Sequence, residues 1–195
     1  MKFTATKFID AHIIQPEPQW DERGYFARTF CSEEFLHHGL ESNFVQHSTS
    51  FSANKGTLRG MHYQEAPHSE VKLVRCLRGA IWDVIVDIRS ASPTYGCWQA
   101  FELSASNGSA LYIPKGFAHG FQALSDNVEV GYLISVPYSP SAARGIRYDD
   151  PTVGIPWPIA VSVISEKDRT WPELVHRPPV QRDCIGETGR SPFTQ

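Results

Sequence analysis

Short runs of β-branched and aromatic residues, separated by turn-forming residues, follow one another along most of this chain. Such runs predict strands, and closely spaced strands without long helices are typical of a β-sandwich or a β-barrel. Arg78-Gly79 and Asn107-Gly108 lie between runs, and we expect a tight hairpin turn at each because glycine and asparagine tolerate positive φ. The sequence therefore predicts an all-β fold. The predicted strands are residues 56–63, 71–77, 80–88, 98–103, 110–113, 120–124 and 128–136.

One short helix interrupts this pattern. Ser32 is placed to cap it, acidic residues follow in its first turn, and Gly39 is placed to end it. Beyond residue 140, repeated prolines predict an ordered loop that wraps the sheet. From residue 176 the sequence has little apolar periodicity and predicts an extended or disordered tail, so we expect one domain over residues 1–175.

Charge and composition exclude several classes of partner. The 195 residues carry a net charge of -3 and no basic cluster, so no nucleic acid is expected as a partner. The most apolar run, residues 80–88, contains two aspartates and is too short to cross a membrane. The four cysteines have no zinc-like spacing, and the first residues lack the apolar run of a secretory signal. We therefore expect a cytoplasmic protein.

The most informative segment is Gly-Thr-Leu-Arg-Gly-Met-His-Tyr-Gln at residues 56–64. Side chains alternate along a strand, so Arg59 and His62 are expected on opposite faces. We expect Lys72 to return next to His62 in an antiparallel partner strand. A lone histidine is more often structural than catalytic. An imidazole beside an ammonium group inside a sheet, however, is more typical of a proton-transfer site than of a core.

Further residues complete the parts that proton abstraction needs. His119 lies in a second glycine-flanked strand, Tyr132 lies in a late strand, and Asp168 follows Ser-Glu-Lys. Together with His62 and Lys72 they supply a base, an orienting carboxylate, a cation for developing negative charge and a phenol for reprotonation.

Arginines near the predicted site favour binding of a diphosphate, because the guanidinium group binds two oxygens at once. Arg59 gives the strongest signal, and Arg23 and Arg75 give weaker ones that also fit ordinary surface arginines.

Several motifs occur in combination along the chain. They are Asp-Glu-Arg-Gly at 21–24, the 56–64 segment, Lys-Leu-Val-Arg at 72–75, Asp-Val-Ile-Val-Asp-Ile-Arg at 83–89, Ser-Pro-Thr-Tyr-Gly at 92–96, Ile-Pro-Lys-Gly-Phe-Ala-His-Gly-Phe at 113–121, Asp-Asp-Pro at 149–151, Trp-Pro at 157–158 and Ser-Glu-Lys-Asp at 165–168. With them, residues 8–174 resemble the dTDP-4-dehydrorhamnose 3,5-epimerase family.

This resemblance implies a cupin-like jelly-roll barrel with a few short helices, forming a homodimer and acting without a metal or an organic cofactor. The implied substrate is a nucleotide-diphospho-4-keto-6-deoxyhexose, whose protons at C3 and C5 flank the ketone. By the same resemblance His62 is the base and Asp168 orients it, as in other dyads. Lys72 stabilises the enolate oxygen, and Tyr132 delivers a proton to the opposite face.

The resemblance also implies a substrate-binding set. Arg59 and His119 match positions that line the sugar-diphosphate pocket, and Lys167 is assigned to substrate binding with them. Arg23 matches a nucleotide-side residue that the partner subunit contributes across the dimer interface. Gln46 belongs to the same nucleotide-binding region.

Four positions depart from the family's thymidine-binding pattern, and one of them is His47, which stands in place of an aspartate. Arg28 stands where the pattern has a glutamate that contacts the base, and Arg28 is therefore a binding candidate of altered chemistry. Ser48 replaces an asparagine, and Ala143 replaces an acidic residue. The identity of the base is therefore open.

Three alternatives remain beside a 3,5-epimerase. The first is an epimerase that acts at one centre, on a CDP- or GDP-linked 4-keto sugar. The second is a metal-dependent cupin, against which Gln64 occupies the place of the second histidine in the usual H-x-H signature. The third is a jelly roll that binds a sugar nucleotide without catalysis.

Overall fold

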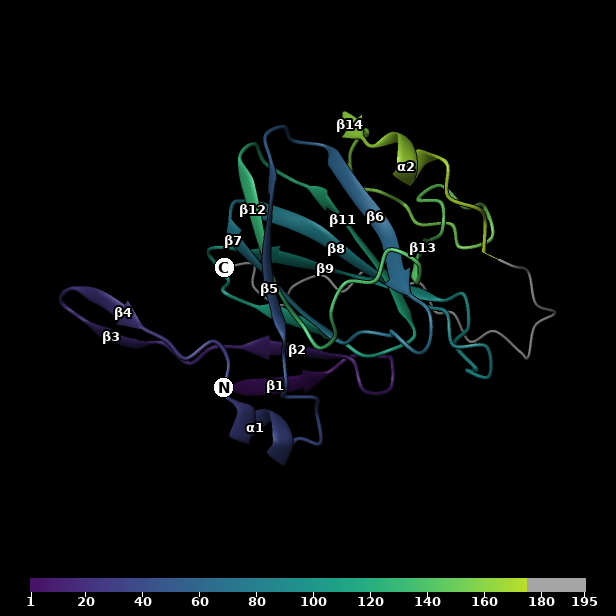
Figure 1. Ribbon diagram of the computed structural model, residues 1–195. Coiled ribbons are helices and arrows are strands. Elements are labelled where there is room, and N and C mark those ends of the chain that lie inside the picture. Colours follow the sequence, from purple (N-terminus) through teal and green to yellow (C-terminus); the bar gives the residue numbers. More distant parts are fainter. Residues whose placement is uncertain (175–195) are drawn as a thin grey trace.

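A computed structural model describes residues 1–174, and the predicted tail from residue 176 lies outside them. Two mainly antiparallel sheets face each other as a sandwich (Figure 1), which confirms the all-β prediction. The first sheet has the order β1 (Lys2–Ala5), β2 (His12–Gln15), β10 (Ala110–Ile113), β7 (Lys72–Arg78), β12 (Val128–Ile134) and β5 (Gln46–Ser52). The second has the order β13 (Ala143–Gly145), β6 (Thr57–Gln64), β11 (Phe117–Ala123), β8 (Ala80–Asp87) and β9 (Trp98–Ser104), and β14 (Val163–Ile164) pairs with β6.

The prediction of a tight hairpin at Arg78-Gly79 and at Asn107-Gly108 is wrong. Strands β7 and β8 flank Arg78-Gly79 but belong to different sheets, and the same holds for β9 and β10 around Asn107-Gly108. Gly79 and Gly108 do adopt positive φ, at 77° and 61°. The chain therefore turns where the residues indicate, but each turn carries it across to the facing sheet.

The space between the sheets holds the main hydrophobic core. Ile81, Ile85 and Phe121 from the second sheet pack there against Val74 and Val130 from the first. All five side chains are almost completely buried. This core fills one end of the sandwich and leaves the other end to polar side chains.

The outer faces of the two sheets are covered unequally. Loop residues such as Ile146 and Val153 pack on Met61 and Val84 and so cover the second sheet. The predicted wrapping of this sheet by the chain beyond residue 140 agrees with these contacts.

On the first sheet, helix α1 (Ser32–His37) buries Phe35 against β2 and β10. The helix starts at Ser32 as its first residue, and Cys31 rather than Ser32 takes the cap position. The opposite half of this outer face, on β5 and β7, leaves Phe51 and Leu77 about half exposed.

A hairpin of β3 (Gln19–Asp21) and β4 (Gly24–Phe26) projects away from the sandwich (Figure 1). Its side chains Trp20, Tyr25 and Phe26 are all mostly exposed. This arm, together with β1, β2 and β5, was not predicted, because these segments are polar or too short to show apolar alternation. Within residues 1–174, no helix is long and apolar enough to cross a membrane.

Candidate functional site

A cavity of about 670 Å³ opens between the two sheets at the polar end of the sandwich. Its size is typical of small-ligand sites. The structure brings eight of the predicted site residues to its walls: Gln46, Arg59, His62, Lys72, His119, Tyr132, Lys167 and Asp168.

His62 and Asp168 form the first pair in this cavity. Asp168 lies in the short helix α2 (Glu166–Arg169), whose cap residue Ser165 accepts a hydrogen bond from the Asp168 amide. The Asp168 Oδ1 is 2.6 Å from the Nε2 of His62, and its Oδ2 accepts from the Gly60 amide.

Burial raises the pKa of the Asp168 carboxyl, but the hydrogen bonds from His62, Gly60 and Ser165, together with the charge of His62, outweigh it and hold the pKa below its ordinary value. An ionised carboxylate only accepts hydrogen bonds, so the His62 Nε2 carries the proton of this bond. The Nδ1 of His62 is then the nitrogen available as a base.

Lys72 approaches His62 from the opposite sheet. The prediction that their strands pair is wrong, because β6 pairs with β11, β13 and β14 while β7 pairs with β10 and β12. The Nζ of Lys72 nevertheless lies 3.5 Å from the carbonyl oxygen of His62. It also lies 2.8 Å from Oε1 of Glu70, with both side chains mostly buried.

Arg59 lines the same cavity as His62, although strict alternation predicts opposite faces. The pairing of β6 with β11 matches His62 to His119 and Arg59 to Phe121, so β6 has one extra residue between them. This bulge contains Gly60, whose φ is 139°, and it shifts the side-chain alternation by one. A Cβ on Gly60 would lie 2.5 Å from the Cα of Gly120 on β11, so the bulge requires glycine.

A second histidine–carboxylate pair lies beside the first. The Nε2 of His119 is 2.7 Å from Oδ1 of Asp83, and both side chains are buried. The other oxygen, Oδ2 of Asp83, is buried without a hydrogen-bond partner in the described part of the chain. Asp83 belongs to one of the sequence motifs but was not predicted as a site residue. A carboxylate within an apolar strand nevertheless indicates a functional site.

Tyr132 completes the inner wall. Its hydroxyl lies 3.2 Å from the Oγ of Ser50, and its ring makes an edge contact with His119. Burial raises the pKa of the Tyr132 phenol well above its ordinary value, and the hydrogen bond with Ser50 offsets part of this rise. The phenol therefore keeps its proton at neutral pH.

Two cations in the cavity have no carboxylate partner among residues 1–174. Arg59 donates to the Oγ of Ser52 and to the carbonyl oxygen of Phe51, and Lys167 lies over the ring of Trp171. The cavity therefore favours an anionic ligand.

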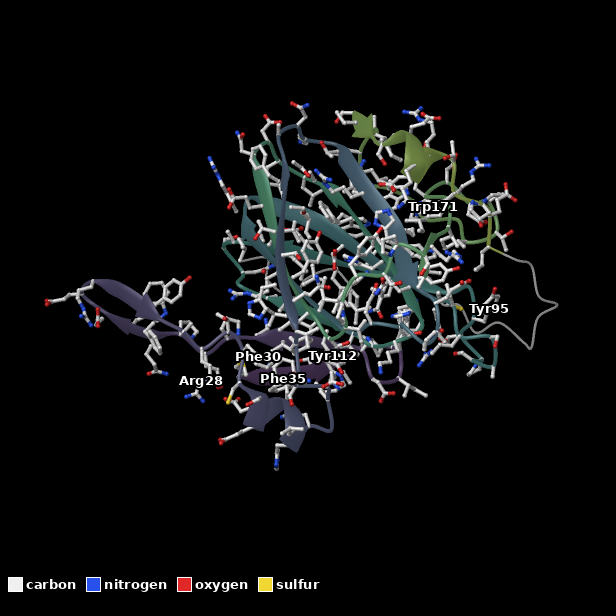
Figure 2. All side chains as sticks on the ribbon, viewed as in Figure 1. Arg28, Phe30, Phe35, Tyr95, Tyr112 and Trp171 are labelled. Atoms are coloured by element: carbon white, nitrogen blue, oxygen red, sulfur yellow. The ribbon has the colours of Figure 1, made fainter. Side chains whose placement is uncertain are left out.

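Arg23 and Arg28 are not brought to the cavity within one protomer. Arg23 lies on the β3–β4 arm and pairs with Asp21. Arg28 lies at the base of the arm, near α1 (Figure 2), where it pairs with Glu34. Two further departures, Ser48 and Ala143, do line the cavity.

Among the cavity residues that the sequence analysis did not predict, three contact or flank the groups described above. Glu70 precedes β7, Ser50 lies on β5, and Trp171 follows α2 (Figure 2). None belongs to a motif that signals chemistry. Among residues 1–174, no three His, Cys, Asp or Glu side chains gather in a way that would hold a metal ion.

Comparison with known proteins identifies the family and agrees with the fold described above. Residues 5–176 match the family model described as dTDP-4-dehydrorhamnose 3,5-epimerase. The chain belongs to this family. The predictions of the family, of a cupin-like fold and of a nucleotide-sugar epimerase are therefore confirmed.

Individual relatives agree with this assignment. A dTDP-4-dehydrorhamnose 3,5-epimerase from Methanothermobacter thermautotrophicus is 48% identical, over 91% of this chain and 96% of that protein. A crystal structure of dTDP-4-dehydrorhamnose 3,5-epimerase from Bacillus anthracis, with TDP and PPi bound, is 40% identical, with a TM-score of 0.86 over 89% of this chain and 99% of that one. A dTDP-4-dehydrorhamnose 3-epimerase from Streptomyces niveus is 37% identical, over 80% of this chain and 75% of that protein.

Proposed function

We propose that this protein inverts C3 and C5 of a nucleotide-diphospho-4-keto-6-deoxyhexose by proton abstraction and reprotonation. The observation that carries the proposal is the convergence of His62–Asp168, Lys72 and Tyr132 on one cavity. The relatives' activity, dTDP-4-dehydrorhamnose 3,5-epimerisation, supports the same reaction.

The proposed chemistry starts at His62. Its Nδ1 takes the proton from the carbon beside the ketone, and Asp168 stabilises the imidazolium that forms. The negative charge that develops on the ketone oxygen is stabilised by the ammonium group of Lys72. Tyr132 delivers a proton to the opposite face of the carbon, which inverts the centre.

The diphosphate of the substrate matches Arg59 and Lys167, the two cavity cations that have no carboxylate partner within the described residues 1–174. A sugar nucleotide carries about two negative charges on its diphosphate, and guanidinium and ammonium groups are the usual partners of such oxygens. His119 and Gln46 line the same cavity and complete the proposed binding set.

Deuterium exchange tests this function. The protein is incubated in D2O with dTDP-, CDP- and GDP-linked 4-keto-6-deoxyhexoses, and NMR follows deuterium at C3 and C5. We expect exchange at both carbons with at least one of these substrates. Absence of exchange with all three would contradict the proposal and would favour a sugar-nucleotide-binding protein without catalysis.

A second candidate is an epimerase that inverts a single centre or takes a base other than thymine. Ser48 and Ala143 in the cavity, and Arg28 on the arm, change the polar groups available to a base. The Streptomyces niveus relative, which is 37% identical and is named a 3-epimerase, supports this candidate. Deuterium at C3 alone would identify this activity, and a thermal-shift panel of nucleoside diphosphates would identify the base.

We also propose that the protein is a homodimer. The projecting arm exposes Trp20, Tyr25 and Phe26, and the bare half of the first sheet exposes Phe51 and Leu77. Exposed apolar groups of this extent support an interface. Arg23 on the arm of one protomer would then reach the nucleotide in its partner. Light scattering tests the proposal, and a monomer mass at micromolar concentration would contradict it.

The single domain over residues 1–175 and the cytoplasmic location stay predictions.

A further inference from the structure

Glu70 forms a mostly buried ion pair with Lys72 in the cavity. One of its carboxylate oxygens lies 2.8 Å from Nζ of Lys72, and the two side chains are only 8% and 12% exposed. No other hydrogen bond or ion pair of the Glu70 side chain occurs within residues 1–174. The carboxylate therefore serves Lys72 alone in this part of the chain.

Burying two charges is costly, and their attraction compensates only when the geometry is good. A hydrophobic pair would fill the same space with less desolvation. The ion pair stands at the first residues of β7, where the Lys72 side chain leaves the sheet and enters the cavity. Because this ion pair lies at the site rather than in the core, its desolvation cost indicates a role in the reaction.

Without Glu70, Lys72 would lose its only close partner among residues 1–174. The remaining contact, from Nζ to the carbonyl oxygen of His62, is 3.5 Å and too long for a strong hydrogen bond. A lysine has a flexible four-carbon stem and gains rotamer freedom when it is released. The ammonium group would then leave its place opposite His62.

We propose that Glu70 is a positioning residue that holds the Lys72 ammonium group at the place where the ketone oxygen of the substrate becomes negative. This inference rests on the proposed function. An ammonium group has three donors, so Lys72 can donate to Glu70 and still donate to the substrate oxygen. No other carboxylate of residues 1–174 lies within 4 Å of Nζ. The other titratable groups of the cavity are Arg59, His62, Tyr63, His119, Tyr132, Tyr138, Arg144, Lys167 and Asp168.

The kinetic test compares Glu70→Gln with a matched control. Glu70→Gln keeps the size of the side chain but removes its charge. We expect the kcat of exchange to fall about ten- to a hundredfold, because a displaced catalytic group costs rate more than binding. The KM is expected to stay within about threefold, because the diphosphate contacts remain. Glu70→Asp shortens the reach by one methylene and is expected to recover part of kcat.

Glu65→Gln is the control. Glu65 lies five residues earlier and pairs with Arg144 at 3.0 Å, but this pair is about half exposed. We expect its kcat to stay within about twofold of the wild type. A Glu70→Gln enzyme with a kcat within twofold of the wild type, or a control that loses as much activity, would overturn the proposal.

A second measurement needs no substrate. The acylation of Lys72 by acetic anhydride at pH 8 is followed by mass spectrometry in the wild type and in both Glu70 variants. The pair holds the Lys72 amine mostly buried, so release of this flexible side chain is expected to make the amine more accessible to the reagent and to raise its labelling rate about tenfold in Glu70→Gln. Glu70→Asp is expected to stay near the wild type. Equal labelling rates in all three proteins would overturn the proposal, even if the wild type shows no epimerase activity at all.

Discussion

The cavity holds two histidine–carboxylate pairs with nearly the same bond length and very different surroundings. The His62 and Asp168 side chains are 42% and 7% exposed, and those of His119 and Asp83 are 6% and 0% exposed. The two histidines are register partners on adjacent strands. The difference therefore arises from the position of each ring relative to the cavity, rather than from the bond itself.

The two carboxylates also differ in exposure, and again the partner of His62 is the more exposed one. Asp83 lies in β8, within the second sheet, whereas Asp168 is supplied by a short helix that follows the last strand. A ring that reaches a ligand can exchange protons with it, while an enclosed ring fixes the wall around it. Burial is thus what distinguishes the pair proposed to react from a pair built of the same groups.

The largest effect is expected from a substitution of His62, the more exposed of the two rings. His62→Gln removes the proposed base and is expected to lower deuterium exchange about 10³-fold, while the thermal midpoint stays within a few degrees. His119→Gln is the matched variant in the buried pair, and we expect a smaller loss of exchange and a clear loss of thermal stability. The contrast would be broken if both variants lost exchange equally.

The next effect concerns reprotonation. Tyr132→Phe removes the phenolic hydroxyl, so His62 still abstracts the proton and returns deuterium from the same face. We expect exchange to stay within about tenfold of the wild type while inversion falls about a hundredfold. NMR of the products separates washout from inversion. Equal losses of both would contradict the assigned role of Tyr132.

A third test measures stability at the buried carboxylate. Asp83→Asn places an NH2 group where the buried Oδ2 has no hydrogen-bond partner in the described chain, and it weakens the bond from His119. We expect the free energy of unfolding in urea to fall by about 2 kcal/mol. Asp168→Asn, at the more exposed pair, is expected to cost less than Asp83→Asn. The reverse order would mean that exposure does not distinguish the two pairs.

The smallest effect is a pH dependence at Asp168. The hydrogen bonds described above hold the pKa of this carboxyl below its ordinary value in the folded protein. Its stabilising contribution is therefore present above about pH 4, the value for the unfolded chain, and is lost as the pH falls through the lowered folded value. The difference in unfolding free energy between the wild type and Asp168→Asn is expected to shrink between about pH 5 and pH 2. A difference that does not change over this range would contradict the lowered pKa.

The sequence predicted the strands with strong apolar alternation and the residues that lie in recognisable motifs. It did not predict β5, because its sequence Gln-His-Ser-Thr-Ser-Phe-Ser is polar and lies at a sheet edge. Nor did it place β7 and β8 in different sheets, since the turn at Gly79 has the same local chemistry in a hairpin and in a crossing.

Two features of the site also escaped the sequence. Arg59 shares a wall with His62 only because of one extra residue in the pairing of β6, and strand alternation contains no sign of that bulge. Glu70 belongs to no motif, and its importance arises from a contact that only the folded chain shows. Local pattern thus predicts which groups are present, while the register of the strands decides which of them meet.

The close approach of Gly60 and Gly120 has a consequence for how this site can change by mutation. A Cβ on Gly60 would meet the Cα of Gly120, and a Cβ on Gly120 would meet the carbonyl oxygen of Arg59 at 2.7 Å. Neither glycine bears a reacting group, yet neither position accepts a larger residue while its partner stays as it is. In a saturation mutagenesis screen, both positions would therefore tolerate as little as His62 does, but the losses would come as missing folded protein. Such a screen would separate the residues that perform the reaction from those that keep the cavity in shape.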